Sequence, residues 1–434
     1  MCSRRLAART QRNHNGVAIE EFDVSGDLVA GLKGDVDRYR EFLASFPADA
    51  ILIKAAHQWS FDACWPVLDR ISARKVFIPC GFSQYFNPAY RTYFRDLAGV
   101  LRKFDHLIFY AEHYRDIDFA RAHGLANCTI VPNGASESEF AAAVDPAFRK
   151  RLGIPPDDFV ILSVGSPPDA KGHREVAAAF AKMDARGRSM SLILNGAWED
   201  AASAPDARAV GEMSARRADA DPSAAVHPSN RLARAVSLWR ERGTMALARR
   251  ALSILSSRRI ALRRARYRRS LDRWIARAAA QPLKKVFQLR LPRDQTVQAF
   301  LTADLFAFAS RIEYSPVVLY EAAAAGTPFV TVPVGNAEEI ARWTGAGIVC
   351  PSRRDARGFT RANPARLARA LERVAADADL RKSLATAGRS AWRTTFNWRS
   401  IAQRYEAILT AGPAMQTEPT AAVQVPAAGT RWGP

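Results

Sequence analysis

Cysteine is scarce in the sequence, with five residues in 434. None belongs to a Cys-x-x-Cys pair, and an odd number of widely spaced cysteines argues against a disulfide framework or a zinc cluster. Long apolar stretches are missing as well, since no segment approaches the roughly 18 uncharged apolar residues that a membrane-spanning helix needs. The basic opening MCSRRLAARTQR is not followed by the apolar core of a secretion signal. We therefore expect a protein of the reducing cytoplasm that is neither secreted nor membrane-spanning.

Acidic residues are in deficit, with 43 Asp or Glu against 63 Lys or Arg, so the formal net charge is +20 and the pI is about 10.3. Residues 231–285 hold 17 of the basic residues and only two acids, and the rest of the chain is nearly balanced. Apolar residues within this segment, such as Tyr267, Leu271 and Trp274, recur at helical spacing. The segment therefore predicts two or three basic amphipathic helices, within an insertion over 199–285.

Three interpretations of these helices are open. They can form a solvated hairpin whose apolar stripe packs on the parent domain, or a surface for anionic lipid headgroups, as arginines beside tryptophan and leucine suggest. They can also bind nucleic acid through its phosphates. The nucleic-acid interpretation is the least favoured, because no recognisable nucleic-acid-binding signature accompanies the segment.

The remaining chain alternates short apolar runs with amphipathic stretches of helical length, which is typical of parallel sheets covered by helices. A Pro/Asp-rich stretch over 145–158 predicts the boundary between a domain over 1–145 and a second over 146–411, and the Pro/Ala/Thr-rich tail over 412–434 predicts disorder. Five strands are expected before the boundary and six after it, over 17–22, 50–55, 75–80, 106–111, 129–132, 159–165, 191–196, 286–291, 305–310, 328–334 and 347–351.

The segment RIEYSPVVLYEAAAAGTPFVTVPVGNAEEI (311–340) carries the most chemical information. Glu313 follows a buried strand, and Glu321 lies eight positions later, within a helix that should start near Ser315 and Pro316, where serine can cap and proline suits the first turn. The backbone N–H groups of Val317, Val318 and Leu319 would then face an incoming anion, as at many phosphate sites. The alternative is that both glutamates only complement the helix dipole or solvate its surface.

The string EYSPVVLYEAAAAGTPFV resembles the Glu-x7-Glu signature of family 4 retaining glycosyltransferases. Other landmarks of that family follow in the expected order, and the resemblance covers about 17–198 and 286–410. It is specific in the second half and loose in the first. The supporting strings are VPNGASESEF, FRKRLGIPPDDFVILSVGS, AKGHREVAAAF and FNWRSIAQRYEAIL.

The resemblance implies two Rossmann-like domains that face each other across a cleft, the GT-B fold. It implies that Lys171 neutralises the donor diphosphate, that Glu321 holds the ribose and that Glu313 lies beside the donor sugar near the reacting carbon. Departure of a nucleoside diphosphate builds negative charge on the leaving oxygen, so an ammonium group and aimed amides stabilise the transition state. No metal and no cofactor besides the nucleotide-sugar donor are then required. The residues expected at the donor are Gly165, Ser166, Lys171, Ser315, Pro316, Val317, Val318 and Glu321.

The sequence departs from the family pattern in both halves. Ser166 stands where the family has an arginine after Gly165, so either its hydroxyl acts together with another cation such as Arg311, or donor affinity is weaker. In the first domain, Cys80 replaces a histidine that commonly contacts the sugar, which leaves His57 as the nearest acceptor-side candidate. The first β-α unit of the family is missing, which fits a start site placed too far downstream; if Met1 is the true start, we expect poor solubility or no activity.

These features together predict a cytoplasmic enzyme at the inner face of the cell membrane. It would transfer a sugar, with retention, to a lipid-linked or polysaccharide acceptor in cell-envelope glycan synthesis. The alternatives are a non-catalytic GT-B scaffold in glycan assembly and a nucleic-acid-binding protein that uses 231–285.

Overall fold

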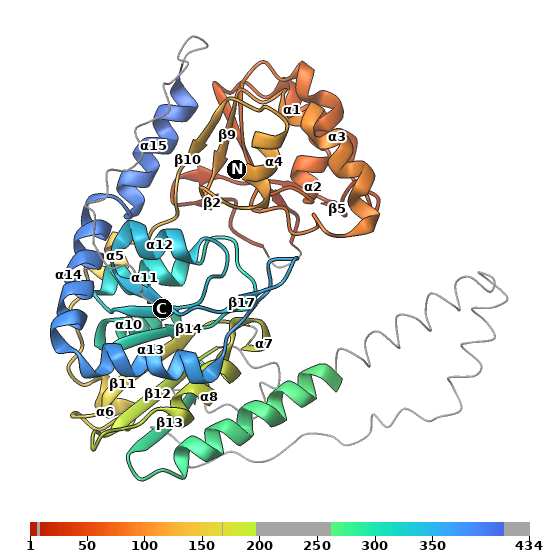
Figure 1. Ribbon diagram of the computed structural model, residues 1–434. Helices are drawn as coiled ribbons and strands as arrows, with labels where there is room; N and C mark the ends of the chain where they lie inside the picture. The colour runs from red at the N-terminus through yellow and green to blue at the C-terminus, as the bar shows by residue number, and fades with distance from the viewer. Residues whose placement is uncertain (7–8, 167, 197–261, 412–434) are drawn as a thin grey trace, which may run out of the picture.

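The computed structural model describes residues 1–6, 9–166, 168–196 and 262–411. Two α/β domains are stacked in Figure 1, and the C-terminal helix runs back from the second alongside the first. The expected disordered tail and residues 199–261 of the insertion lie outside the described residues. The expected boundary near 145 falls between the last strand of the first sheet and the first strand of the second.

The first domain is built on a parallel four-stranded sheet with the order β10-β9-β8-β7. The strand expected at 17–22 is not part of it, because these residues form short strands that pair with other N-terminal segments, which leaves four main-sheet strands where five were expected. The main strands are β7 (Ala50–Lys54), β8 (Arg74–Ile78), β9 (His106–Phe109) and β10 (Cys128–Ile130), and the short pairs are β1 (Cys2–Arg4) with β4 (Glu20–Phe22), β2 (Asn13–His14) with β3 (Val17–Ala18), and β5 (Val24–Ser25) with β6 (Lys33–Gly34).

One face of this sheet is covered by the domain's own helices around an aromatic-rich core. That core includes Phe61 and Phe77, whose rings stack at 4.0 Å between centroids. The helical elements are α1 (Val36–Ser45), α2 (Trp59–Asp62), α3 (Arg91–Leu101), α4 (Arg115–Ala122) and the 3-10 turns η1 (Trp65–Arg70) and η2 (Pro88–Tyr90), and α5 (Glu137–Phe140) and α6 (Phe148–Arg151) lead to the second domain.

The second domain contains a parallel six-stranded sheet with the order β13-β12-β11-β14-β15-β16. Its central strands are continuous apolar runs because helices cover both faces. All six strands fall where the sequence predicts them, although β13 begins at Lys284, two residues earlier than expected, so the insertion ends before that residue. The strands are β11 (Phe159–Val164), β12 (Met190–Asn195), β13 (Lys284–Leu289), β14 (Leu305–Phe308), β15 (Phe329–Thr331) and β16 (Gly347–Val349), followed by the β17 (Arg353–Arg354) and β18 (Thr360–Arg361) hairpin.

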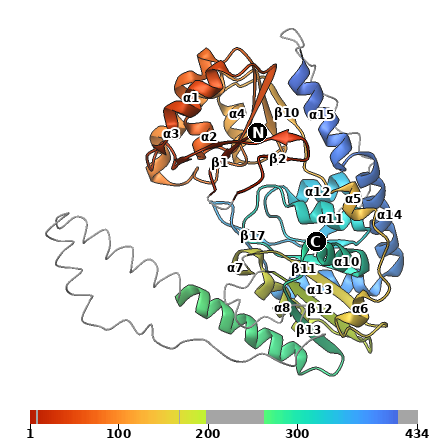
Figure 2. The same cartoon turned by 180° about the vertical axis from the view of Figure 1, so that it is seen from behind.

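Helices of the second domain surround this sheet, as both views of the chain show (Figures 1 and 2). Helix α13 has a full N-terminal signature, since the Asn363 side chain accepts hydrogen bonds from Ala365 and Arg366, and Pro364 occupies the first turn. The helices are α7 (Pro168–Lys171), α8 (His173–Lys182), α10 (Arg293–Thr302), α11 (Val317–Ala325), α12 (Ala337–Thr344), α13 (Pro364–Ala376), α14 (Ala378–Thr394) and α15 (Trp398–Thr410), with a further helix over 262–279.

Helix α15 closes the free face of the first sheet. Ile401 is buried among Val76, Ile78 and Ile108 of that sheet. Hydrogen bonds in both directions also hold the helix, since Arg74 Nε donates to Ile408 O at 2.8 Å and Arg404 Nη2 donates to Ile130 O at 2.6 Å. The C-terminal segment of the chain therefore ties the second domain to the first.

Candidate active site

Lys171 is the last residue of the short helix α7, which follows β11 at the carboxyl end of the second sheet. Gly172 adopts a φ of 77°, and a Cβ on it would lie 2.0 Å from the carbonyl oxygen of Ala309. Only glycine allows such an approach in the left-handed region. The Lys171-Gly172 pair therefore packs directly on the segment that follows β14.

Glu313 lies on that segment and contacts Lys171. The Lys171 Nζ atom is 2.6 Å from Glu313 Oε1, and Ser310 Oγ donates to the same oxygen at 2.8 Å. Both charged side chains are mostly shielded, with 26% of Lys171 and 13% of Glu313 exposed. The two residues that the resemblance assigns to the diphosphate and the donor sugar are thus in direct contact.

Helix α11 begins beside this pair. Its first residue is Val317 and Pro316 occupies the N-cap position without a side-chain cap, so the expected capping by Ser315 is wrong. The N–H groups of Val317 and Val318 belong to the first turn, where no i→i−4 partner exists. The amide of Leu319 donates to Pro316 O at 3.2 Å, which corrects the expectation that it also faces an anion.

Glu321 lies in the second turn of α11 and is 7% exposed. Its Oε1 atom is 2.7 Å from Nη2 of Arg293, at the start of α10, and Arg293 also makes a two-pronged contact with Glu139 on α5, at 2.7 Å for each prong. Burial raises the pKa of Glu321, and the Arg293 guanidinium opposes that shift. The Arg293 side chain lowers the pKa of Glu139 by its hydrogen bonds. Sequence reasoning missed Arg293, although it opens the helix that follows the edge strand β13.

Two further residues flank Lys171. Ser166 follows Gly165 at the end of β11, and its side chain is exposed. The Arg311 N–H donates to Ala170 O at 2.9 Å, so the exposed Arg311 side chain starts from the same junction as Lys171. The Arg311 side chain therefore starts close to Lys171, and its role as a second cation stays a prediction.

His57 and Cys80 lie at the carboxyl ends of β7 and β8, and both have a φ of 60°. The His57 ring is surrounded by aromatic rings, with centroids 4.8 Å from Tyr93 and 5.3 Å from Phe94. Burial lowers the pKa of His57 to about 4 and raises the pKa of Cys80 to about 11. Both groups are therefore neutral near pH 7, and neither contacts Lys171 or Glu313 through any hydrogen bond or ion pair found among the described residues.

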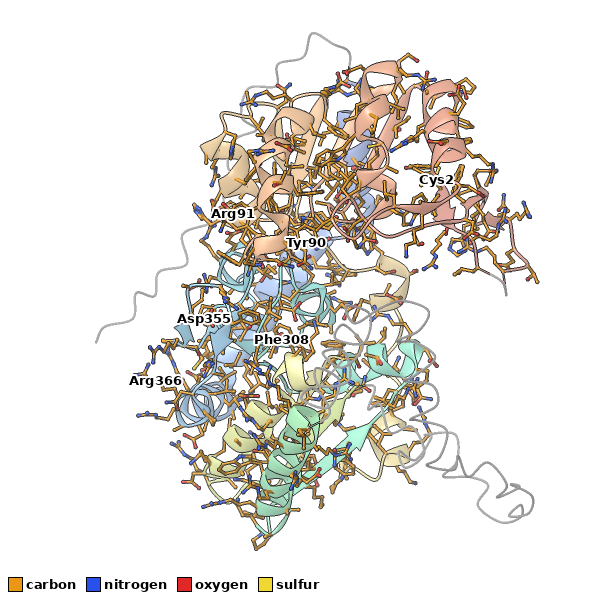
Figure 3. All side chains as sticks on the ribbon, turned by 90° about the vertical axis from the view of Figure 1, so that its right-hand side faces the viewer. Cys2, Tyr90, Arg91, Phe308, Asp355 and Arg366 are labelled. Atoms are coloured by element: carbon orange, nitrogen blue, oxygen red, sulfur yellow. The ribbon has the colours of Figure 1, made fainter. Side chains whose placement is uncertain are left out.

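The aromatic cluster around His57 continues to the domain junction, and Tyr90 lies on the side of the first domain that faces the second (Figure 3).

Tyr314, the residue after Glu313, contacts the first domain across that junction. The Tyr314 hydroxyl accepts a hydrogen bond from the Tyr110 N–H at 3.0 Å, and a Cβ on Gly81 would lie 2.8 Å from its ring. Tyr114, in turn, donates to the carbonyl oxygen of Glu313 at 2.7 Å.

Helix α12 strengthens this junction. The Glu339 carboxylate accepts hydrogen bonds from the N–H groups of Glu112 and His113 at 2.8 and 2.9 Å, and Asn336 Nδ2 donates to Tyr110 O at 2.9 Å. We call the junction formed by 110–114, 313–314 and 336–339 the interdomain seam. The seam fixes the Glu313 backbone against the first domain.

The basic helix over 262–279 is the part of the insertion that the structure describes. Leu271 and Ala278 are fully buried in the core of the second domain, and Tyr267 and Trp274 pack against that core. The opposite side of the helix forms an open groove lined by Leu262, Arg266, Arg269, Asp272 and Arg273. Trp274 is therefore packed against protein, as the hairpin interpretation requires, and the outward face of the helix carries mainly arginines.

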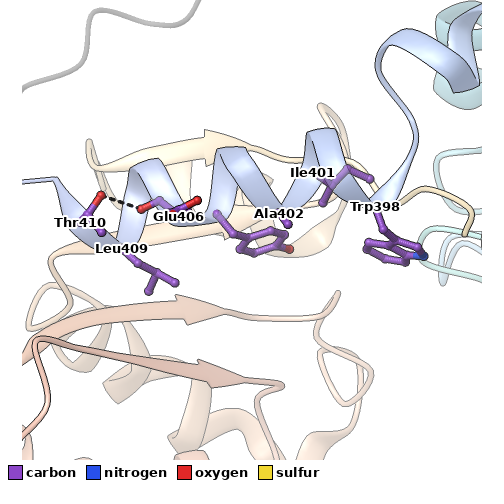
Figure 4. A pocket seen from close by; sticks show the side chains of 7 residues that line it. Trp398, Ile401, Ala402, Glu406, Leu409 and Thr410 are labelled. Atoms are coloured by element: carbon purple, nitrogen blue, oxygen red, sulfur yellow. Dashed lines mark hydrogen bonds between the residues drawn. The ribbon is translucent and has the colours of Figure 1, made fainter. Parts of the chain in front are cut away.

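A separate shallow groove of about 530 Å³ lies along α15 (Figure 4). Its lining comes from α15 alone and includes neither Lys171 nor the two glutamates. Within the described residues, no group of three or more His, Cys, Asp or Glu is arranged to hold a metal ion. No helix there has the length and apolar character needed to cross a membrane.

Comparisons with known proteins agree with the fold. The family model of glycosyl transferases group 1 matches residues 272–391, which include both glutamates but not Lys171. No curated protein matches the sequence.

Solved structures resemble this chain over most of its length at low sequence identity. Sucrose-phosphate synthase from Thermosynechococcus elongatus is 16% identical over 94% of this chain and 87% of its own, with a TM-score of 0.60. HepE from Anabaena, solved in complex with UDP, is 15% identical over 91% and 86%, with a TM-score of 0.60. WaaG, a glycosyltransferase involved in lipopolysaccharide biosynthesis, is 15% identical over 93% and 89%, with a TM-score of 0.52. The expected GT-B fold of two Rossmann-like domains is thereby confirmed, and the match to the group 1 model supports the glycosyltransferase class.

Proposed function

We propose that this protein is a metal-independent, family 4 type glycosyltransferase that transfers a sugar from a nucleotide-diphosphate donor with retention. The observation that carries the proposal is the contact of Lys171 with Glu313 beside the first turn of α11. A cation, a carboxylate and unpaired helix amides meet there at the carboxyl ends of parallel strands, where α/β proteins bind phosphorylated ligands.

The chemistry assigns one task to each group. The Lys171 ammonium and the amides of Val317 and Val318 bind the diphosphate and stabilise the charge that develops as it leaves. Glu321 accepts hydrogen bonds from the ribose hydroxyls, and Glu313 lies beside the donor sugar. We assign no covalent intermediate to Glu313 and expect no cofactor besides the donor.

Nucleotide binding to the full chain tests this assignment. Calorimetric titration with UDP and with GDP should reveal binding of one of them, and Glu321→Gln should weaken it about 10- to 100-fold, since a hydrogen bond to a charged group contributes about 1.5–3 kcal/mol. Glu41→Gln removes a comparable charge from an exposed pair in the first domain and should leave the affinity unchanged. Absence of binding by both nucleotides to the wild-type chain would refute the proposal.

A non-catalytic GT-B scaffold is the second candidate. It is favoured by the observation that Lys171 is engaged by Glu313 and Glu321 by Arg293, so the charges of the site already compensate one another. A scaffold of this kind would bind the nucleotide but release no sugar from any UDP- or GDP-sugar.

For the acceptor, we propose a lipid-linked or polysaccharide glycan of the cell envelope at the cytoplasmic face of the membrane. The support is the arginine face of the helix over 262–279. Because the apolar stripe of that helix is packed on the protein, its contact with lipid would be electrostatic and peripheral. Nucleic acid remains the less favoured partner of the same face.

Replacing arginines of this face should weaken membrane association. The triple variant Arg266→Gln, Arg269→Gln, Arg273→Gln should bind phosphatidylserine vesicles about 100-fold more weakly, at about 1 kcal/mol for each arginine near the surface. Co-sedimentation with anionic and with neutral vesicles measures the effect.

A charge-matched control is available in the first domain. The variant Arg38→Gln, Arg70→Gln, Arg95→Gln loses the same net charge from exposed ion pairs and should sediment like the wild type. Equal losses in the two variants would contradict a specific lipid face, and retention on DNA with a steep salt dependence would favour the nucleic-acid interpretation instead.

A further inference from the structure

The donor side of the second domain contains an arginine between two carboxylates that come from different parts of the chain. Arg293 Nε and Nη2 contact the two oxygens of Glu139, and Nη2 also contacts Oε1 of Glu321, all at 2.7 Å. Glu139 belongs to the segment that connects the domains, whereas Glu321 belongs to α11. The guanidinium fork thus joins the connecting segment to the helix that begins at the candidate diphosphate site.

We infer that Arg293 is a positioning residue that keeps Glu321 an oriented carboxylate, and that Glu139 holds Arg293 in place for this purpose. The inference rests on the proposed role of Glu321 in ribose binding. A two-pronged arginine contact fixes direction as well as charge. The contact with Glu139 determines the plane of the Arg293 guanidinium. Nη2 of that guanidinium therefore holds the contacting oxygen of Glu321 in one place.

The surroundings of Glu321 make such support necessary. The side chain is 7% exposed, and a buried carboxylate without a compensating charge is costly and tends to become protonated. Protonation would remove the charge that ribose hydroxyls are expected to meet. Arg293 is itself 46% exposed, so it stands between the buried carboxylate and solvent.

Several charged groups lie on the elements that pack against α11. Among them, Arg293 is the cation that pairs with Glu321. From α5, Glu139 raises the pKa of Glu321, and from α10, Arg293 lowers it. From α14, the Arg389 guanidinium is bonded to the carbonyl oxygens of Ala324 and Phe140. On α12, the carboxylate of Glu339 is engaged by the amides of the interdomain seam.

Arg293→Met tests the inference through its pH dependence. Without the guanidinium the pKa of Glu321 rises, so the variant should bind the accepted nucleotide, UDP or GDP, progressively less well than the wild type as the pH falls from 8 to 5.5. The ratio of affinities should grow by up to tenfold for each pH unit below the raised pKa. Arg293→Lys keeps the charge and should restore most of the affinity, although it cannot make the two-pronged contact.

Thermal stability gives a readout that needs no nucleotide. A carboxyl whose folded-state pKa is raised destabilises the fold most when it is charged, at high pH. The melting temperature of Arg293→Met should therefore fall furthest below that of the wild type at pH 8, and the gap should narrow toward pH 5. Adding Glu321→Gln to Arg293→Met should remove this pH dependence.

Each outcome decides the inference. An affinity ratio and a melting gap that do not change with pH, or tighter nucleotide binding by Arg293→Met, would overturn it. Arg70→Met breaks an exposed pair with Glu41 and should leave both profiles unchanged. If the wild type binds neither nucleotide, the proposed function fails, whereas the melting profiles still decide whether Arg293 keeps Glu321 charged.

Discussion

Replacing Lys171 with methionine is expected to lower the turnover of the nucleotide sugar by about 10²–10³-fold, the usual effect of removing one preorganised group that stabilises a developing anion. The loss should appear in kcat more than in KM, because the ammonium interacts most strongly with the charge that forms as the diphosphate leaves. Release of UDP or GDP from a panel of their sugars measures it.

The double variant Lys171→Met, Glu313→Gln distinguishes the loss of turnover from the loss of stability that an unpaired Glu313 carboxylate causes. Lys171→Met alone leaves the shielded Glu313 carboxylate without its ammonium partner, which lowers stability, and neutralising Glu313 should restore that stability without restoring turnover. Lys75→Met breaks a partly shielded pair with Asp105 in the first domain and should leave turnover unchanged. Full activity of Lys171→Met would contradict the role given to the ammonium.

The places of Lys171, Glu313 and Glu321 in the fold could be predicted from the sequence because each residue lies in a short local pattern, whereas their roles stay predictions. Lys171 precedes a glycine at the start of a helix. Glu313 lies in the loop before α11, and Glu321 lies eight positions later within that helix. The strands that precede these residues were predictable as well, since buried strands of a parallel sheet are continuous apolar runs. The strand expected at 17–22 does not form as one strand, because its two halves pair with different N-terminal segments: Val17–Ala18 with Asn13–His14, and Glu20–Phe22 with Cys2–Arg4.

Arg293 and Tyr314 could not be predicted, because their partners are remote in the sequence. Arg293 meets Glu139 across 154 positions, and Tyr314 meets Tyr110 across 204. No periodicity within one element reveals such pairs, and an arginine at a helix start ordinarily indicates only a solvated side chain. The Glu-x7-Glu signature specifies no residue at position 314, so the resemblance gave no indication that a side chain would cross to the first domain.

The basic insertion shows a different limit. Helical spacing correctly identified Tyr267, Leu271, Trp274 and Ala278 as one stripe, but spacing cannot say whether that stripe meets lipid or protein. The structure places it on the second domain, where Lys182 lies 5.5 Å from the Trp274 ring centroid. The outer face of this helix is therefore mainly charged, with Leu262 as its exposed large apolar side chain.

Gly172→Ala is expected to disable the donor site by displacing Lys171. An added Cβ would lie 2.0 Å from Ala309 O and 2.4 Å from Ala309 C, both backbone atoms that no side-chain rotation can move away. The left-handed backbone adds about 1–2 kcal/mol and the forced overpacking about 1–3 kcal/mol, so the variant should lose about 2–5 kcal/mol of stability. The displaced turn would also separate Lys171 from Glu313 and weaken nucleotide binding.

Gly187 provides the matched control for this prediction. It has the same φ of 77°, but no atom lies within 4 Å of the position of an added Cβ. Gly187→Ala should therefore show only the backbone effect of about 1–2 kcal/mol in denaturant unfolding, with nucleotide affinity unchanged. If the two alanine variants lose equal stability and bind nucleotide equally well, the close packing of Gly172 on Ala309 does not position Lys171. A larger loss confined to Gly172→Ala would make this contact the structural basis of the lysine's placement beside Glu313.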